Sequence, residues 1–256
     1  MTFPVLQDKV AIVTGAAMGM GEATARLFAE AGAKVIVADF NVEAGEKVVA
    51  DITAAGGTAT FVAVDISDEA QVEEMVKAAV STYGRLDVAV NNAALKPDQA
   101  PSAELDPAYW DRLMSVDLKG TALCQKHELK QFLAQGEGGS IVNIASVSGF
   151  RPQPGNPAYT AAKHGVVGLT KVAALEYGSL GVRVNAVAPG AVQTPMLDAA
   201  LEEIGADRDE FAKQLSSLGR FADAREIAQA TLWLSSDAAS YVHGTTLKVD
   251  GGFTGM

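Results

Sequence analysis

The sequence predicts an α/β protein in which one doubly wound parallel sheet of about seven strands carries helices on both faces. Three observations indicate this fold class. Short runs rich in β-branched residues alternate along the chain with longer helical segments. These runs are almost continuously apolar, as strands buried on both faces must be. No break in composition and no linker rich in Pro or Ser divides the 256 residues, so we expect a single domain over 1–256.

The elements follow one another in the order that right-handed βαβ units require. Ser67-Asp68-Glu69 marks one helix start, because acidic side chains favour the positive end of the helix dipole. From Gly190 to about Gly219 the pattern is less regular, and we expect a mobile substrate lid at about 190–219. The expected strands are Lys9–Thr14, Lys34–Ala38, Thr60–Val64, Asp87–Val90, Ser140–Ala145, Val182–Val187 and Thr245–Val249. The expected helices are Gly21–Ala31, Val42–Ala55, Asp68–Tyr83, Ala108–Ala134, Asn156–Tyr177 and Ala224–Ser235.

The net charge of the chain argues against two classes of binding partner. The chain has 20 Lys and Arg residues against 31 Asp and Glu residues, a formal net charge of −11. Nucleic acids and anionic membranes are bound by clustered basic residues, so we expect neither as a partner. The segment Met1–Lys9 lacks the pattern of a signal peptide, and no apolar stretch reaches the roughly 18 residues of a membrane span. We expect a cytoplasmic protein.

Metal chemistry is not expected either. Cys124 is the only cysteine, which excludes an intrachain disulfide and a cysteine-based zinc framework and fits a reducing compartment. His127, His164 and His243 are scattered along the chain without a metal-ligand spacing. We therefore expect no metal cofactor.

Glycine is enriched, at 25 of 256 residues. Gly15, Gly19 and Gly21 fall in the turn TGAAMGMG, between the first expected strand and the first expected helix. Glycines let the backbone turn sharply and let a pyrophosphate approach a helix N-terminus. The spacing G-x-x-x-G-x-G differs from the common dinucleotide fingerprint, and a purely structural turn is the alternative. The cofactor contacts expected here are Gly15, Met18, Gly19 and Met20.

Asp39 ends the next strand, 18 residues after Gly21. A carboxylate at this place accepts hydrogen bonds from both ribose hydroxyls of NAD and repels the 2′-phosphate of NADP. Met18 and Phe40 supply no cation that could hold such a phosphate. We expect NAD as the cofactor, with Asp39 and Phe40 among its contacts; the alternative for Asp39 is an ordinary turn residue.

Three further side chains suggest proton transfer. Ser146 follows the fifth expected strand, and Tyr159 and Lys163 come 13 and 17 residues later on one face of a helix, at i and i+4. A free phenol has a pKa of about 10, too high for an efficient base near neutrality. A neighbouring ammonium favours the phenolate, which can then exchange a proton with an alcohol or carbonyl oxygen. The hydroxyl of Ser146 could hold that same oxygen.

Taken together, these motifs resemble the short-chain dehydrogenase/reductase superfamily, in its single-domain Rossmann-fold subtype of about 250 residues. The resemblance covers almost the whole chain, and its motifs occur in the family's order. They are Thr14–Gly21, Asp65, Asn91-Asn92-Ala93, Ser146, Tyr159, Lys163, Pro189-Gly190 and Asp250-Gly251-Gly252.

The resemblance implies a role for each residue. Tyr159 would be the acid/base, Ser146 would orient the substrate oxygen, and Lys163 would bind the nicotinamide ribose. Such enzymes are usually homotetramers. The other implied cofactor contacts are Asp65 and Ile66 at the adenine, Asn91 near the adenosine ribose, Ala93 of the same motif, and Pro189, Gly190, Val192 and Thr194 over the nicotinamide.

Two positions depart from the family pattern. Ala94 stands where the family commonly has glycine, and its methyl group either shapes the space beside the nicotinamide or only packs against the sheet. Asp117 stands where most members have an asparagine that supports a proton relay from the lysine. Asp117 could hold the relay water and favour the ammonium form of Lys163; alternatively it is merely structural.

The surrounding sequence suggests where substrate lies. Arg151–Asn156 precedes Tyr159 and is expected to rim the active site. Met196 and Leu197 lie near the start of the lid segment. Their side chains either pack in the core or contact the substrate. The helical spacing of Trp110 and Trp233 is typical of packing residues.

We therefore expect an NAD(H)-dependent oxidoreductase that interconverts a secondary alcohol and its ketone. The segments NNAA, PGAV and GGFT resemble bacterial dehydrogenases for cyclic alcohols and dihydrodiols. One alternative is a 3-oxoacyl thioester reductase, which usually uses NADPH. Another is an NAD-binding scaffold without turnover.

Overall fold

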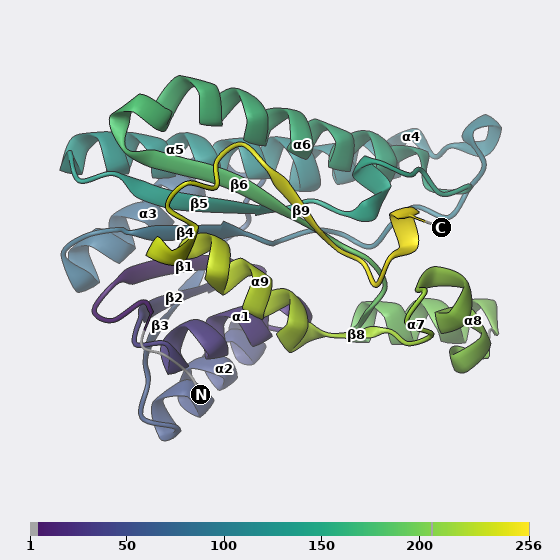
Figure 1. Cartoon of the computed structure of the whole chain (residues 1–256), viewed down its shortest axis with the longest axis horizontal. Helices are drawn as coiled ribbons and strands as arrows, with labels where there is room; N and C mark the ends of the chain where they lie inside the picture. Colours follow the sequence, from purple (N-terminus) through teal and green to yellow (C-terminus); the bar gives the residue numbers. More distant parts are fainter. Residues whose placement is uncertain (1–4, 206, 256) are drawn as a thin grey trace.

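A seven-stranded sheet forms the centre of the molecule (Figure 1). The computed structural model describes residues 5–205 and 207–255. The strand order is β3-β2-β1-β4-β5-β6-β9, and all neighbouring strands run parallel, which confirms the predicted fold class. The strands are β1 (Val10–Thr14), β2 (Lys34–Asp39), β3 (Thr58–Ala63), β4 (Val88–Asn91), β5 (Gly139–Ile144), β6 (Val182–Pro189) and β9 (Thr246–Val249).

Helices cover both faces of this sheet. In Figure 1, α1, α2 and α9 lie below it and α3, α5 and α6 above it; α1 packs along α9, and α3 along α5. Among the described residues, no helix is long and apolar enough to cross a membrane. The helices are α1 (Gly19–Glu30), α2 (Val42–Ala54), α3 (Glu69–Tyr83), α4 (Pro107–Leu113), α5 (Thr121–Gln135), α6 (Pro157–Tyr177), α7 (Pro195–Ile204), α8 (Arg208–Leu215) and α9 (Ala224–Ser235).

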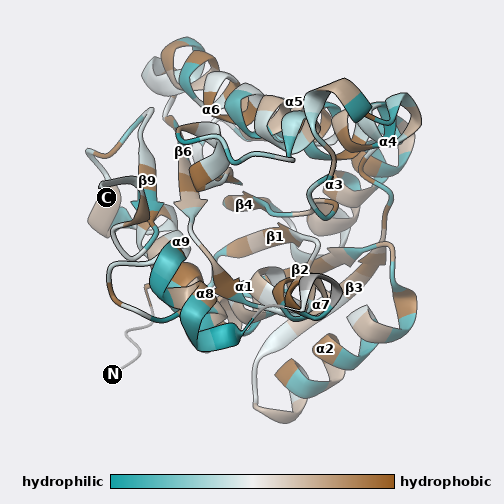
Figure 2. Cartoon of the chain, turned by 90° about the vertical axis from the view of Figure 1, so that its right-hand side faces the viewer, coloured by the Kyte–Doolittle hydropathy of each residue, from teal (hydrophilic) through white to brown (hydrophobic). Residues whose placement is uncertain are grey.

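The apolar character of the strands follows from this double cover. In β1, Ala11 and Val13 belong to the apolar cluster beneath α1 and α9, whereas Val10 and Ile12 belong to the cluster beneath α3 and α5. Side chains alternate between the faces of a strand, so each face of β1 must be apolar when both are covered. Figure 2 shows the strands as largely hydrophobic between two helix layers.

The sheet reverses its winding between β1 and β4. On one side of β1 the chain adds β2 and then β3. On the other side it adds β4, followed by β5, β6 and β9. In such sheets ligands bind outside the carboxyl ends of the strands at this reversal. The two loops are tied together there, because the Thr14 hydroxyl accepts hydrogen bonds from the N–H groups of Asn92 (3.0 Å) and Ala93 (3.2 Å).

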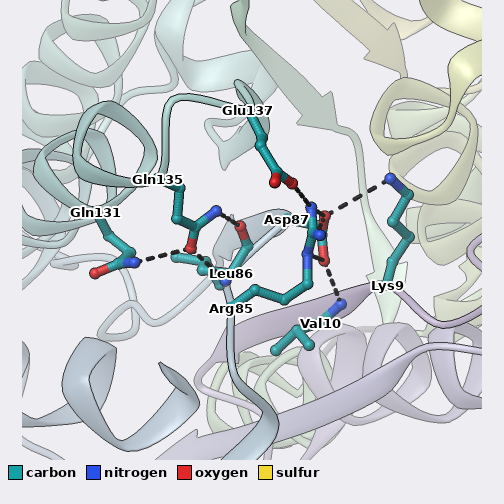
Figure 3. A network of polar contacts seen from close by, with 8 residues as sticks. All are labelled: Lys9, Val10, Arg85, Leu86, Asp87, Gln131, Gln135 and Glu137. Carbon is teal, nitrogen blue, oxygen red and sulfur yellow. Dashed lines mark hydrogen bonds and ion pairs between the residues drawn. The ribbon is translucent and has the colours of Figure 1, made fainter. Parts of the chain in front are cut away.

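At the opposite end of β1 and β4, a polar network fixes the two strands relative to each other (Figure 3). The buried carboxylate of Asp87 accepts a hydrogen bond from the Val10 N–H at 2.8 Å and from the Arg85 guanidinium. Gln135, from the end of α5, both accepts from and donates to the main chain of Leu86, each at 2.7 Å. The network lies at the amino ends of β1 and β4, and the loops that build the site follow the opposite, carboxyl ends.

One predicted helix is interrupted. The sequence pattern over Ala108–Ala134 predicts a single helix, but the structure has α4, then a π-helical turn over Met114–Gly120, then α5. A π turn inserts an extra residue into the hydrogen-bonding pattern, and such turns often occur at functional sites. Hydropathy patterns do not distinguish a π turn from α-helix, and this one carries Asp117.

The expected lid is more regular than its sequence suggests. It contains α7, α8 and the short strand β7 (Val192–Gln193), which pairs with β8 (Ala222–Asp223) just after the lid. Side chains cap both helices: the Thr194 hydroxyl accepts from the Leu197 N–H, and Asp207 accepts from two N–H groups of α8. Much of α8 is teal in Figure 2, and its polar residues Asp209, Glu210, Lys213 and Gln214 are exposed, whereas Ala212 is buried.

Parts of two predictions lie outside the described residues. These are Met1–Pro4, within the start segment assessed for a signal peptide, and Ala206, within the lid.

Candidate active site

The glycine-rich turn makes a close approach between β1, α1 and the loop after β4. Gly15 has φ of +63°, and a Cβ there would lie 2.7 Å from the Ala93 Cα; a Cβ on Gly21 would overlap the carbonyl oxygen of Gly15. Asn92 donates its amide to the carbonyl oxygens of Thr14 and Gly15 at 3.0 and 3.1 Å. The turn requires glycine at Gly15, and the close approach to that turn requires it at Gly21, which lies in the first turn of α1.

This turn fits the pyrophosphate of a dinucleotide. The side chain of Met18, at the N-cap of α1, makes no capping hydrogen bond among the described residues, so it occupies none of the N–H groups in the first turn of the helix. Free N–H groups at a helix N-terminus form an anion site. Met18 and Met20 line the adjoining pocket, and Gly19 lies between them.

Asp39 lies beside the same turn. Its side chain is 6% exposed; Oδ2 accepts a hydrogen bond from the Ala17 N–H at 2.9 Å, and Oδ1 accepts from the Asn41 N–H at 2.9 Å. The adjacent Phe40 is 76% exposed and Met18 is 48% exposed. Asp39 therefore presents a fixed negative charge at the end of β2, next to apolar side chains.

Ser146, Tyr159 and Lys163 converge at the carboxyl end of β5. Ser146 and Tyr159 line a pocket of about 870 Å³. The Ser146 Oγ accepts a hydrogen bond from the Ser148 N–H at 3.1 Å, which leaves its own hydrogen available to a substrate oxygen. Lys163 is 2% exposed; its Nζ donates to the Ile144 carbonyl at 3.2 Å and lies 5.3 Å from the centre of the Tyr159 ring. The ammonium is thus placed to favour a phenolate.

The π turn places Asp117 against Lys163. Asp117 is fully buried; its Oδ1 accepts a hydrogen bond from the Leu95 N–H at 2.8 Å, and its Oδ2 lies 3.5 Å from the Lys163 Nζ. Oδ2 has no hydrogen-bond partner among the described residues. Burial raises the pKa of Asp117, while the Lys163 charge and the Leu95 N–H oppose that shift. The oxygen of Asp117 that faces Lys163 therefore has no hydrogen-bond donor among the described residues.

Two residues expected at the adenosine half have side chains in the core. The Asn91 amide donates to Glu128 and to Asn143, each at 3.0 Å, so its side chain is held between β4, β5 and α5. Burial raises the pKa of Glu128 to about 8, and the hydrogen bond from Asn91 opposes the shift. Ile66 is buried against Gly120. Contacts of Asn91 and Ile66 with a cofactor would thus be made by the backbone.

Other predicted cofactor residues lie around the same edge of the sheet. Asp65 is exposed after β3, where its Oδ1 accepts from the N–H and hydroxyl of Ser67. Ala93 lies at the close approach to Gly15. Pro189, Gly190, Val192 and Thr194 line the pocket beside Ser146 and Tyr159. The structure therefore brings the predicted nicotinamide residues to the same cavity as Ser146 and Tyr159, with Lys163 buried beside the Tyr159 ring.

Two further predicted segments contribute to the lining of the pocket. Met196 and Leu197 both line it, and Leu197 also packs against the apolar cluster of Leu201, Ala212 and Phe221. Of the segment Arg151–Asn156, the residues Gln153, Pro154, Gly155 and Asn156 line the pocket. Trp233, predicted to pack, is instead 41% exposed on α9.

Sequence reasoning missed the loop after β4 as a source of pocket residues. Lys96, Pro97 and Gln99 line the pocket, as do Phe211 and Leu215 of α8. Lys96-Pro97-Asp98-Gln99 is a polar stretch that follows the end of a strand. Loops in such places often carry functional residues, so this pattern could have indicated a contribution to the pocket.

Known proteins resemble this chain over almost its whole length. A family model described as enoyl-(acyl carrier protein) reductase matches residues 15–254. A short chain dehydrogenase/reductase of Aspergillus oryzae, astE, is 49% identical over 97% of this chain and 96% of that protein. A 2,5-dichloro-2,5-cyclohexadiene-1,4-diol dehydrogenase of Sphingobium indicum is 45% identical over 98% of this chain and 99% of that protein.

Solved structures show the same architecture. The crystal structure of levodione reductase superposes with a TM-score of 0.92 at 39% identity, covering 96% of this chain and 98% of that one. A putative 2-deoxy-d-gluconate 3-dehydrogenase from Agrobacterium tumefaciens, solved with bound NADP, has a TM-score of 0.89 at 37% identity, covering 99% of each chain.

Proposed function

This chain belongs to the short-chain dehydrogenase/reductase family, and on that basis we propose that it is an NAD(H)-dependent dehydrogenase of cyclic secondary alcohols. Ser146 and Tyr159 line one pocket together with residues of the segment Pro189–Thr194, and the buried Lys163 ammonium lies 5.3 Å from the centre of the Tyr159 ring; this arrangement carries the proposal. Its relatives are oxidoreductases, and one is a dehydrogenase of a cyclic diol. Cellular NAD pools are usually oxidised, so we expect alcohol oxidation to be the favoured direction.

The chain's own residues would handle the proton and the substrate oxygen. Ser146 donates its hydroxyl hydrogen to the substrate oxygen and holds the carbinol in place. Tyr159, as phenolate, accepts the hydroxyl proton of the alcohol. Lys163 stabilises that phenolate with its buried charge and binds the ribose of the nicotinamide. The bound nicotinamide cofactor supplies the acceptor for the hydride.

For Asp117 we propose a place in the relay that returns this proton to solvent. Its Oδ2 lies 3.5 Å from the Lys163 Nζ and accepts no hydrogen bond from the described residues, so it could hold a water beside the ammonium. A purely structural ion pair is the alternative. The pH–rate profile of Asp117→Asn distinguishes them, because a charge with no catalytic part leaves that profile unchanged.

The lid helices supply specificity. We propose that α7 and α8, which place Met196, Leu197, Phe211 and Leu215 around the pocket, close over the substrate. Such an apolar wall suits a ring with little polar surface opposite its hydroxyl.

A panel of alcohols with both cofactors tests the function. We expect the strongest rise in NADH absorbance with cyclic secondary alcohols and NAD⁺, weaker turnover of linear ones, and little reduction of 3-oxoacyl thioesters with NADPH. Preference for the thioester would make the reductase alternative correct. Cofactor binding without turnover of any alcohol, ketone or thioester would instead indicate a scaffold.

Asp39→Ala tests the cofactor preference. Removal of the carboxylate takes away the ribose acceptor and the repulsion of a 2′-phosphate, so kcat/KM with NAD⁺ should fall and that with NADP⁺ should rise. We expect the NAD/NADP ratio of kcat/KM to fall on the order of a hundredfold, equivalent to about 2.7 kcal/mol. The ratio is measured with one alcohol at fixed pH. An unchanged ratio would show that Asp39 does not select the cofactor.

A further inference from the structure

Helix α6, which carries Tyr159 and Lys163, begins without a local cap. Its N-cap residue is Asn156, a type that commonly accepts hydrogen bonds from the N–H groups at N2 or N3. Here Asn156 makes no side-chain cap among the described residues; it donates its amide to the carbonyl oxygen of Asp98 instead. Pro157 at the first helical position has no N–H, so the next two N–H groups, those of Ala158 and Tyr159, need an acceptor.

That acceptor comes from a loop about sixty residues earlier. The Asp98 Oδ2 accepts a hydrogen bond from the Ala158 N–H at 3.0 Å, and its Oδ1 accepts from the Tyr159 N–H at 3.1 Å. The half-buried carboxylate thus binds one N–H with each oxygen, and its charge complements the positive end of the helix dipole. One of these two bonds is made to the backbone of the proposed acid/base itself.

The loop that carries Asp98 is fixed at both ends by other contacts. At its start, the Leu95 N–H donates to Asp117, which also faces Lys163. At its end, the Ala100 N–H donates to the Gly155 carbonyl at 2.9 Å. The loop is therefore anchored independently of the Asp98 side chain, and substitution of that side chain removes the contact to α6 without releasing the loop.

We propose that Asp98 is a positioning residue for Tyr159, supplying from the loop after β4 the cap that α6 lacks. The proposal rests on the proposed function, because it concerns where the phenol lies relative to the substrate oxygen. Two carboxylates then join one loop to one helix: Asp117 at Lys163, and Asp98 one turn earlier at Tyr159. Small displacements of a reacting group lower turnover strongly, so a frayed first turn of α6 lowers kcat more than it lowers cofactor affinity.

The test compares Asp98→Ala and Asp98→Asn with the parent. Asp98→Ala removes both acceptors, whereas the asparagine amide oxygen can still accept one N–H. We expect kcat per NADH-binding site to fall on the order of tenfold in Asp98→Ala. The loss should be smaller in Asp98→Asn, and the dissociation constant of NADH should be unchanged in both. Amide hydrogen exchange at Ala158 and Tyr159 should be faster in Asp98→Ala.

Asp106→Ala is the matched control. Asp106 is an N-cap acid whose side chain accepts from the Ala108 N–H at 2.9 Å in α4 and makes no hydrogen bond to α6 among the described residues. We expect it to leave kcat unchanged. Equal losses of kcat in Asp106→Ala and Asp98→Ala would show a general effect of capping and overturn the proposal, as would an unchanged kcat and unchanged exchange in Asp98→Ala. A parent that binds NADH but turns over no substrate would overturn the proposed function instead, while the exchange rates still report whether Asp98 holds the first turn of α6.

Discussion

Replacement of Tyr159 by phenylalanine is expected to lower kcat by about 10²–10⁴-fold, the range that positioned acid/base groups contribute. Phenylalanine keeps the ring that lies beside Lys163 and removes only the hydroxyl that would exchange the proton. The substitution deletes no backbone hydrogen bond, because Tyr159 contacts Asp98 through its N–H. The loss should therefore appear in turnover and not in folding. Steady-state NADH formation with a cyclic alcohol measures it.

Controls on this variant separate chemistry from binding. The melting temperature and the dissociation constant of NADH should match those of the parent. Ser146→Ala should give a smaller loss of kcat, because serine orients the substrate oxygen and Tyr159 takes the proton. Turnover of Tyr159→Phe within a few-fold of the parent would contradict the mechanism and leave the acid/base role to another group.

Lys163→Met is expected to lower both activity and stability, for two different reasons. The ammonium that favours the phenolate is lost, so kcat should fall by at least about a hundredfold. The fully buried Asp117 also loses its counter-charge. Breaking a buried ion pair on one side costs about 3–5 kcal/mol, and denaturant unfolding of the variant measures this.

The buried carboxyl of Asp117 determines how the stability of Lys163→Met changes with pH. Burial already raises the pKa of Asp117, and removal of the opposing Lys163 charge raises it further. An acid whose pKa is higher in the folded than in the unfolded chain destabilises the fold as pH rises from the unfolded value upward. The deficit of Lys163→Met should therefore be larger at neutral pH than below about pH 4, where a free carboxyl is protonated.

The double variant Lys163→Met/Asp117→Asn separates the two effects. Removal of the unpaired charge should restore most of the stability at neutral pH, while activity remains low because no ammonium faces Tyr159. A double variant as unstable as Lys163→Met would show that packing of the lysine side chain, and not charge pairing, accounts for the deficit. Recovery of activity would remove Lys163 from the proposed mechanism.

Much of the architecture could be predicted from local patterns. Each of the seven parallel strands overlaps an expected apolar run. The five inner strands are buried on both faces, which leaves a strong signal in sequence, whereas the edge strands β3 and β9 are only partly buried. The interruption of Ala108–Ala134 by a π turn could not be predicted, since its side chains keep a helical hydropathy pattern. The order of α7 and α8 was underestimated, because capping by Thr194 and Asp207 and packing around Phe211 stabilise short helices of mixed composition.

The candidate site was predictable where its members share a motif. Ser146 follows β5, and Tyr159 and Lys163 lie one turn apart on the next helix, α6, so short-range spacing brings the three together. Asn91 and Ile66 show the limit of such reasoning, since a motif does not say whether a side chain faces the cofactor edge or the core. Both side chains lie in the core.

By itself, the sequence determined the sheet, the glycine turn at Gly15–Gly21, and the set of groups able to exchange a proton, because these depend on residue type and short-range spacing. Tertiary structure alone decided the rest. It set Asp117 at 3.5 Å from the Lys163 Nζ and placed both oxygens of Asp98 on the first turn of α6. These contacts join segments 46 and about 60 residues apart, and nothing in a local pattern specifies which loop will reach a buried charge or an uncapped helix. The packing of α6 against the π turn, and its hydrogen bonds to the loop after β4, specify it.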